Sequence, residues 1–325
     1  MFGQLINILR ENPKKIVFTE GNDPRILEAS SRLLASTFLA PILIGNKEEV
    51  ERAAEESGFN IRGAQIIDPE NYEGMDEMAQ QLYEIRKSKG MTLDQARETC
   101  KQGNYFGTML VKMGKADALL GGATYSTADT VRPALQIIKT KPGKNIVASC
   151  FILVRESATD GNSVLAMGDC AINIKPNEDE LAEIAVDCAE CAKIFGIDPK
   201  VAFLSYSTLG SGKGEDVDKM RIAAEKAQEL DPSLPIIGEV QFDAAVSPRV
   251  ARTKCPNSNV AGSCNTFIFP DINAGNIGYK IAQRLGHFDA YGPIMLGLNA
   301  PINDLSRGCN AQEVYSMAII TAALA

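Results

Sequence analysis

The chain has 325 residues, about twice the usual domain of about 150 residues, so we expect two domains. Its 33 Lys and Arg against 41 Asp and Glu give a net charge of -8, which excludes a broad nucleic-acid surface because such a surface needs a basic stripe. Any anionic ligand must therefore meet a local cluster of arginines. The hydrophobic fraction of 45% is typical of a globular chain, and no apolar run reaches the about 18 residues of a membrane span.

Short apolar runs alternate with longer helical patterns, which is typical of βαβ units and a mostly parallel sheet. Residues 1–15 have the pattern of an amphipathic helix without the features of a signal peptide. The next part of the chain predicts strands over 15–19, 40–44 and 116–120, and helices over 23–34, 47–57, 75–89, 92–101, 104–112 and 127–139. Residues 140–145, rich in Pro, Gly and charge, are the best candidate for a domain boundary.

A second alternating series follows this boundary. The pattern predicts strands over 146–154, 164–172, 201–205, 236–242, 264–269 and 291–298, and helices over 177–195, 216–230, 275–285 and 311–324. Asn177, with Glu180 three residues later, predicts a capping box at the start of one of these helices. The fold class is therefore α/β with two lobes.

Several catalytic classes are disfavoured because their residues are missing. The Gly-rich segment 209–214 matches neither a dinucleotide motif nor a P-loop, so it is either a simple strand-to-helix turn or an anion contact through backbone N–H groups. The one histidine, His287, has no Cys or His partner at metal spacing, so a metal site there is disfavoured. A Ser-His-Asp triad is also disfavoured, because the chain has only this histidine. Cys188-Ala-Glu-Cys191 lies in a predicted helix and is expected to pack. The chemistry should then depend on carboxylates, hydroxyls and arginines.

Residues 301–310 concentrate such groups between a predicted strand and the N-terminus of the last helix, where α/β folds bind anions. Ser306 could donate to a reacting oxygen, and Arg307 could bind a phosphoryl or carbonyl oxygen. Glu313 stands three residues after Asn310. It is either the capping-box partner of Asn310 or a general base, and the sequence leaves both open.

Residues 121–133 form a second concentration, in which two glycines precede a crowd of hydroxyl side chains. Ser126, Thr127 and Thr130, followed by Arg132, are suited to wrapping a small oxyanion. The alternative is an ordinary Ser/Thr-rich helix cap. Arg86, near the end of its helix, is either a further anion ligand or a partner of the helix C-terminus.

With these segments in view, the chain closely resembles the phosphate acetyl/butyryltransferase family, in the short catalytic-core form of phosphate acetyltransferase. The likeness is carried in order by Phe18-Thr-Glu-Gly-Asn-Asp23, Arg86-Lys-Ser-Lys-Gly-Met91, Ser126-Thr-Ala-Asp-Thr-Val-Arg-Pro-Ala-Leu-Gln-Ile-Ile-Lys-Thr140, Phe269-Pro-Asp-Ile-Asn-Ala-Gly-Asn-Ile-Gly-Tyr-Lys280 and Asn303-Asp-Leu-Ser-Arg-Gly-Cys309. The resemblance implies a homodimer with an isocitrate/isopropylmalate dehydrogenase-like fold. Its two α/β domains would be 1–143 with 298–325, and 144–297, with the active site in the cleft between them.

The resemblance also implies residue roles. Arg86, Arg132 and Arg307 would face one cleft, and Arg284 matches a position associated with coenzyme A. The family usually has an aspartate as the proposed base where this chain has Glu313, and commonly a histidine where it has Tyr125. The expected catalytic residues are Ser306, Arg307 and Glu313, and the expected substrate-binding residues are Arg86, Ser126, Thr127, Thr130, Arg132 and Arg284.

The reaction implied is acetyl-CoA plus phosphate giving acetyl phosphate plus CoA, with CoA as a substrate and with no metal or covalently bound cofactor. A phosphate butyryltransferase is the nearest alternative. A metal- and NAD-dependent decarboxylating dehydrogenase and a non-enzymatic acyl-phosphate or CoA-binding module are more distant ones. We expect a cytoplasmic protein whose eight cysteines are reduced and whose partners include neither nucleic acid nor membrane.

Overall fold

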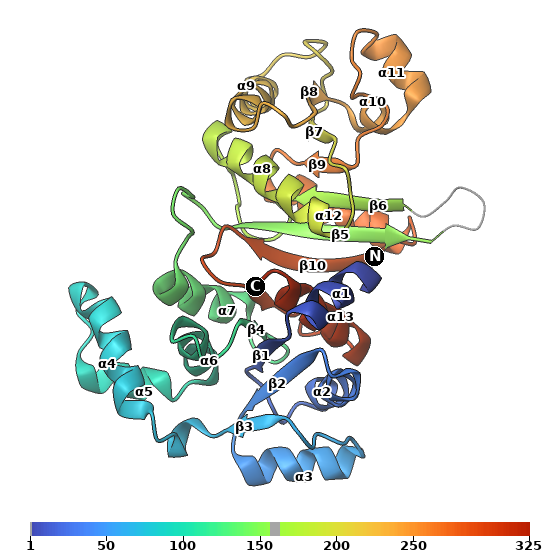
Figure 1. The fold of residues 1–325 in the computed structure, drawn as a ribbon. Helices are drawn as coiled ribbons and strands as arrows, with labels where there is room; N and C mark the ends of the chain where they lie inside the picture. The colour runs from blue at the N-terminus through green and yellow to red at the C-terminus, as the bar shows by residue number, and fades with distance from the viewer. Residues whose placement is uncertain (1, 157–162) are drawn as a thin grey trace. The chain divides into compact units, whose positions relative to one another are not determined.

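The computed structural model describes residues 2–156 and 163–325, and the chain divides into two compact units (Figure 1). Unit 1 consists of Met1–Pro142 and Leu298–Ala325, and unit 2 of Gly143–Gly297. Among the described residues, no helix is both long and apolar enough to cross a membrane. Every residue predicted for the site lies in unit 1 except Arg284, which lies in unit 2.

Unit 1 is built on a five-stranded parallel sheet. Its strands, in spatial order, are β11 (Ile302–Asp304), β4 (Ala118–Gly121), β1 (Lys14–Phe18), β2 (Leu39–Ile44) and β3 (Gln65–Ile67). The central strands are mostly apolar and buried, because helices cover both faces of a parallel sheet. The edge strands β3 and β11 have three residues each and were not predicted, because so short a run carries too little pattern.

Eight helices of unit 1 are described. They are α1 (Phe2–Glu11), α2 (Pro24–Ser36), α3 (Lys47–Ser57), α4 (Met75–Arg86), α5 (Leu93–Cys100), α6 (Gly103–Lys112), α7 (Thr127–Pro133) and α13 (Ala311–Ala323). Four of them, α2, α3, α5 and α13, begin at a residue whose side chain caps the helix. The predicted helix 127–139 is correct in place, but after Pro133 it continues as a π-helix, Ala134–Ile138. The C-terminal helix α13 packs against α1, α2 and β4, so both ends of the chain build one core.

Unit 2 has a six-stranded mixed sheet. Its strands, in order, are β10 (Asp289–Leu296), β5 (Ala148–Arg155), β6 (Ser163–Gly168), β9 (Thr266–Ile268), β7 (Val201–Leu204) and β8 (Ile236–Val240). The first two pairings are antiparallel and the other three are parallel. The helices are α8 (Glu178–Ile194), α9 (Glu215–Leu230), α10 (Phe242–Val246), α11 (Pro248–Lys254) and α12 (Ile272–Arg284). The capping box of Asn177 and Glu180 is confirmed at the start of α8.

Two predicted strands of unit 2 are too long. The strand over 164–172 ends at Gly168, because the Asp169 carboxylate accepts the backbone N–H groups of Ala171 and Ile172, which a strand would need for pairing. The strand over 236–242 ends at Val240, and Phe242 begins α10. Helices α10 and α11 were missed because each is shorter than two and a half turns.

Candidate active site

Three loops of unit 1 meet where neighbouring parallel strands end. They follow β1, β4 and β11, which are adjacent in the sheet. The Leu305 backbone N–H donates to the Gly121 carbonyl at 2.7 Å, which joins the loops after β11 and β4. The Glu20 carboxylate accepts the N–H groups of Gly122 at 3.1 Å and Thr124 at 3.0 Å, which joins the loops after β1 and β4. This edge of an α/β sheet is where such folds bind ligands.

Gly122 lets the loop after β4 pass directly over Asp304. Its φ angle is 95°, in the region that favours glycine, and a Cβ atom there would overlap Oδ1 of Asp304. The second of the two glycines predicted to end the strand is therefore needed because the two loops approach each other closely there.

Asp304 is a buried carboxylate, 2% exposed, at the end of β11. It accepts the hydroxyls of Thr127 at 2.6 Å and Thr130 at 2.5 Å. Burial raises the pKa of Asp304 to about 6, the two hydroxyls act against this rise, and the charge of Glu20 adds to it. Two of the hydroxyls predicted for substrate thus hold the strand end that precedes Ser306, and Thr130 is itself only 1% exposed.

A hydrogen-bonded chain runs from Tyr125 to Glu20. The Thr19 hydroxyl donates to Glu20 at 2.7 Å, so the Tyr125 hydroxyl, 2.7 Å from Thr19 Oγ1, is the donor in that contact. Burial raises the pKa values of both Glu20 and Tyr125. The Thr19 hydroxyl therefore links Tyr125, in the loop after β4, to Glu20, in the loop after β1.

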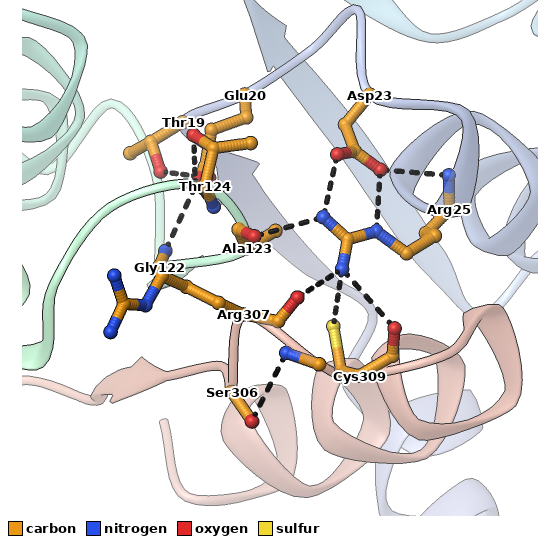
Figure 2. A network of polar contacts seen from close by, with 11 residues as sticks. Thr19, Glu20, Asp23, Arg25, Gly122, Ala123, Thr124, Ser306, Arg307 and Cys309 are labelled. Carbon is orange, nitrogen blue, oxygen red and sulfur yellow. Dashed lines mark hydrogen bonds and ion pairs between the residues drawn. The ribbon is translucent and has the colours of Figure 1, made fainter.

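Ser306 and Arg307 are exposed at the tip of the loop after β11. The Ser306 hydroxyl accepts the N–H of Gly308 at 3.2 Å, so its own hydrogen can be donated to a ligand. The Arg307 backbone carbonyl accepts from Arg25, while its side chain extends away from Arg25 (Figure 2). The arrangement presents one hydroxyl and one guanidinium to solvent from a fixed turn.

Glu313 and Asn310 form the predicted capping box at the start of α13. Oε2 of Glu313 accepts the Asn310 N–H at 3.1 Å. The second oxygen, Oε1, can still accept a proton, so the cap is compatible with a role as base. That role stays a prediction.

The positive charges of Arg86 and Arg132 both act on the side chain of Tyr105. Both positive charges lower the pKa of Tyr105, whereas burial, the larger effect, raises it. The Arg86 Nε–H is buried and lacks a hydrogen-bond partner within the described part of the chain. Arg132 is about half exposed and pairs with Asp129 at 3.2 Å. A buried N–H without a partner is rare, which makes Arg86 the stronger candidate of the two for an anion ligand.

The remaining predicted residues are placed as follows. Ser126 donates to Asp129 at 2.7 Å, beside Arg132. Arg284 is exposed at the last position of α12 in unit 2, and its association with CoA stays a prediction.

The Gly-rich segment of unit 2 uses its backbone amides within the protein. Gly210 donates to Glu239 at 2.7 Å and Gly212 to the Ser207 hydroxyl at 2.8 Å. These two amides are therefore not available for the anion contact that the sequence left open. Within residues 2–156 and 163–325, no group of three His, Cys, Asp or Glu side chains is placed to hold a metal ion.

Arg25, Glu20 and Asp304 are absent from the sequence-based prediction of the site. Arg25 lies 98 residues from Ala123 and 282 from Arg307, both of which it contacts. Contacts over such separations leave no local pattern. The available signals were that Glu20 and Asp304 each fall inside a motif of the resemblance, and that Glu20 directly follows a predicted strand.

Comparison with known proteins agrees with this architecture. A family model described as phosphate acetyl/butaryl transferase matches residues 1–322. A phosphate acetyltransferase of Bacillus subtilis (strain 168) is 53% identical over 311 residues, which cover 96% of this chain and 94% of that protein. The crystal structure of a phosphotransacetylase from Streptococcus pyogenes has a TM-score of 0.95 at 53% identity, covering 99% of this chain and 97% of that one. The EutD phosphotransacetylase from Staphylococcus aureus has a TM-score of 0.90 at 46% identity, covering 99% and 98%.

The fold, together with these matches, identifies the chain as an acyltransferase of α/β architecture. It belongs to the phosphate acetyl/butyryltransferase family. The resemblance drawn from the sequence is thereby confirmed.

Proposed function

We propose that the chain is a phosphate acetyltransferase, which transfers the acetyl group reversibly between CoA and inorganic phosphate. The observation that carries this proposal is the exposed Ser306–Arg307 turn at the carboxyl end of β11. The same unit holds the Arg86 Nε–H, which has no hydrogen-bond partner among the residues that the structure describes. Relatives at 53% identity that are named phosphate acetyltransferase or phosphotransacetylase support it.

In the direction of acetyl-CoA synthesis, the sulfur of CoA attacks the carbonyl carbon of acetyl phosphate. The C–S bond forms, the bond from that carbon to the bridging oxygen breaks, and phosphate leaves with the electron pair. A thiol with a pKa of about 8.5 is mostly protonated at neutral pH, so the attack needs a proton acceptor. We assign this role to Glu313, whose Oε1 is not used by the cap.

Negative charge grows on the carbonyl oxygen and on the departing phosphate. Ser306 and Arg307 would oppose it at the carbonyl, and Arg86 and Arg132 at the phosphate, by fixed electrostatic donors. No acyl-enzyme is needed, because both substrates can react directly in a ternary complex. Ser126 would contribute a further polar contact beside Arg132, and Arg284 would bind CoA.

Thr127 and Thr130 enter this scheme in a different way from the other binding residues. Their hydroxyls donate to Asp304, so we propose that they shape the phosphate site through that carboxylate. Thr127 is exposed and can also contribute through its backbone, whereas Thr130 is buried.

We propose a homodimer that works in the cytoplasm, in acetate metabolism. One face of α12 and its C-cap leaves Ile277, Ile281 and Leu285 exposed at 58%, 53% and 76%. Apolar residues four positions apart on a helix form one stripe, and such a stripe is typical of a protein interface. All eight cysteines are free and buried, which agrees with the proposed cytoplasmic location because thiols stay reduced there.

The decisive assay measures CoA-dependent formation of acetyl-CoA from acetyl phosphate, with butyryl phosphate in parallel and without metal or nicotinamide cofactor. Acetyl-CoA formation that exceeds butyryl-CoA formation is expected. Preference for butyryl phosphate would make the chain a phosphate butyryltransferase, and turnover that requires Mg²⁺ and NAD would contradict both. Arg307→Ala should lower kcat by roughly 10²- to 10³-fold, since one electrostatic donor to the transition state is lost. Arg307→Lys should bind CoA almost as well as the parent.

A further inference from the structure

We infer that Arg25 is a positioning residue, which holds the Ser306–Arg307 turn in its working conformation by bonding its backbone from behind. The inference rests on the proposed function, because it assigns that turn to the transition state. Arg25 lies in the first turn of α2, after the loop that follows β1. It lies two residues beyond the motif Phe18–Asp23 and was not among the residues expected at the site.

Each of the five N–H groups of the Arg25 guanidinium has an oxygen to bond. Nε and Nη2 donate to the two carboxylate oxygens of Asp23 at 2.9 and 2.7 Å. Nη2 also donates to the Ala123 carbonyl at 2.8 Å. Nη1 donates to the carbonyls of Arg307 at 2.8 Å and Cys309 at 3.2 Å (Figure 2). Arginine is the one side chain with five donors in a planar fork, so no other residue can replace this set.

These bonds join three separate segments. Asp23 caps α2 by accepting the Arg25 backbone N–H at 2.9 Å, which anchors the guanidinium at the end of the β1 loop. Ala123 belongs to the loop after β4, and Arg307 and Cys309 to the loop after β11. One side chain therefore sets the relative position of all three loops around the candidate site.

The loop after β11 is a tight turn whose geometry depends on these bonds. The Cys309 N–H donates to the Ser306 carbonyl at 2.9 Å, which closes a four-residue turn. Arg25 binds the carbonyls of the second and fourth residues of that turn. Because the Arg307 carbonyl is fixed on one side, its side chain is directed to the other, away from Arg25 (Figure 2).

Arg25 itself is not a substrate ligand. Its charge is balanced by Asp23 through two oxygens, and its side chain is only 27% exposed. Burial acts to raise the pKa of Asp23, but the bonds and the charge of Arg25 outweigh it and lower that pKa. All five donors are used within the protein, so the residue can influence the reaction only through the loops that it holds.

The test compares Arg25→Ala and Arg25→Lys with Arg32→Ala in the full-length protein. Arg32 lies on the same helix and also reaches α13, through Gln312 at 2.7 Å, but it contacts neither the turn nor Ala123 among the bonds observed. Small displacements of catalytic groups reduce turnover by roughly 10²-fold. We expect kcat of Arg25→Ala to fall by about that factor with a KM for CoA near the parent value, Arg25→Lys to be intermediate, and Arg32→Ala to keep parental kcat.

Two readouts separate positioning from loss of fold. Guanidinium ion at millimolar concentration should restore part of the activity of Arg25→Ala, because it supplies the same planar set of N–H donors. Amide hydrogen exchange of residues 305–309 should become faster in Arg25→Ala while that of β1 and β2 stays unchanged. Parental kcat, or unchanged exchange in 305–309, would overturn the inference. If the parent itself forms no acetyl-CoA, the proposed function fails, and the exchange measurement still decides whether Arg25 fixes the turn.

Discussion

Glu313 and Asn310 satisfy each other's backbone at the start of α13. The Glu313 N–H donates to Oδ1 of Asn310 at 2.9 Å, and the Asn310 N–H donates to Oε2 of Glu313 at 3.1 Å. A capping box of this kind needs one oxygen of the glutamate. The other oxygen can still take a proton, so the two alternative roles of Glu313 are separable by experiment.

Glu313→Gln tests which role limits turnover. Glutamine can still accept the Asn310 N–H, so the free energy of unfolding should fall by no more than about 1 kcal/mol. It cannot accept a proton, so kcat with CoA should drop by roughly 10²- to 10⁴-fold. Thermal unfolding and initial rates measure the two effects, and Glu313→Asp, which restores the usual family residue, should keep much of the activity. Parental kcat in Glu313→Gln would leave Glu313 as a helix cap only.

Arg132→Ala tests whether this guanidinium binds phosphate. We expect the KM for acetyl phosphate or phosphate to rise by about 10- to 100-fold, since a charged hydrogen bond is lost, and the KM for CoA to change much less. The half-exposed pair with Asp129 contributes little to stability, so the melting temperature should hardly move. Arg97→Ala, which removes another exposed ion-paired arginine of unit 1, is the matched control. Equal weakening for both substrates would show that Arg132 only supports the fold.

Asp304→Asn tests the buried carboxylate. Its pKa in the folded protein, about 6, lies above the ordinary 3.8, so the folded state holds the proton more tightly than the unfolded state. The stability that this group contributes is therefore fully present below about pH 4 and is lost as the pH rises to about 6. Between pH 4 and pH 7, the free energy of unfolding of the parent, measured in urea, should fall by up to roughly 3 kcal/mol relative to that of Asp304→Asn. A constant difference between the two proteins across this range would contradict the raised pKa.

Gly122→Ala tests the close approach of the loop to Asp304. The left-handed conformation alone destabilises alanine by about 1 to 2 kcal/mol, and the overlap with Oδ1 of Asp304 adds to this. Gly58→Ala is the control, because Gly58 has a φ of 74° but open space around it. Gly122→Ala should lower the melting temperature more than Gly58→Ala and should also reduce kcat. Equal effects on stability with parental kcat would show that the loop gives way without consequence for the site.

Elements with strong local signals could be predicted from the sequence. Helix α3 matches its predicted bounds because Asn46 caps its start and Gly58, in the left-handed region, ends it. The strand predicted over 164–172 is correct as far as Gly168 and wrong beyond it, because the Asp169 side chain accepts the amides that would have continued it. Apolar pattern alone does not contain that information.

The residues of the candidate site also differ in whether a local sequence pattern indicates them. Ser306, Arg307 and Glu313 stand close together in the sequence, and their catalytic roles stay a prediction. The binding role expected for Thr130 did not anticipate its hydrogen bond to Asp304, which lies 174 residues away. Arg25 shows the same limit, since its partners become neighbours only when β1, β4 and β11 are paired. Contacts that depend on strand order are decided by tertiary structure.

The division of unit 1 between the two ends of the chain has a consequence for biosynthesis. Unit 2 is a continuous segment and can fold on the ribosome as soon as its last strand, β10, has emerged. Unit 1 completes its folding later than unit 2. One edge of its sheet stays open until β11 pairs with β4, and its core stays incomplete until α13 packs against α2. The turn carrying Ser306 and Arg307 is translated in this final stretch. A nascent chain therefore cannot complete the sheet of unit 1, or hold this turn beside the end of β4, before residues 302–323 have been translated.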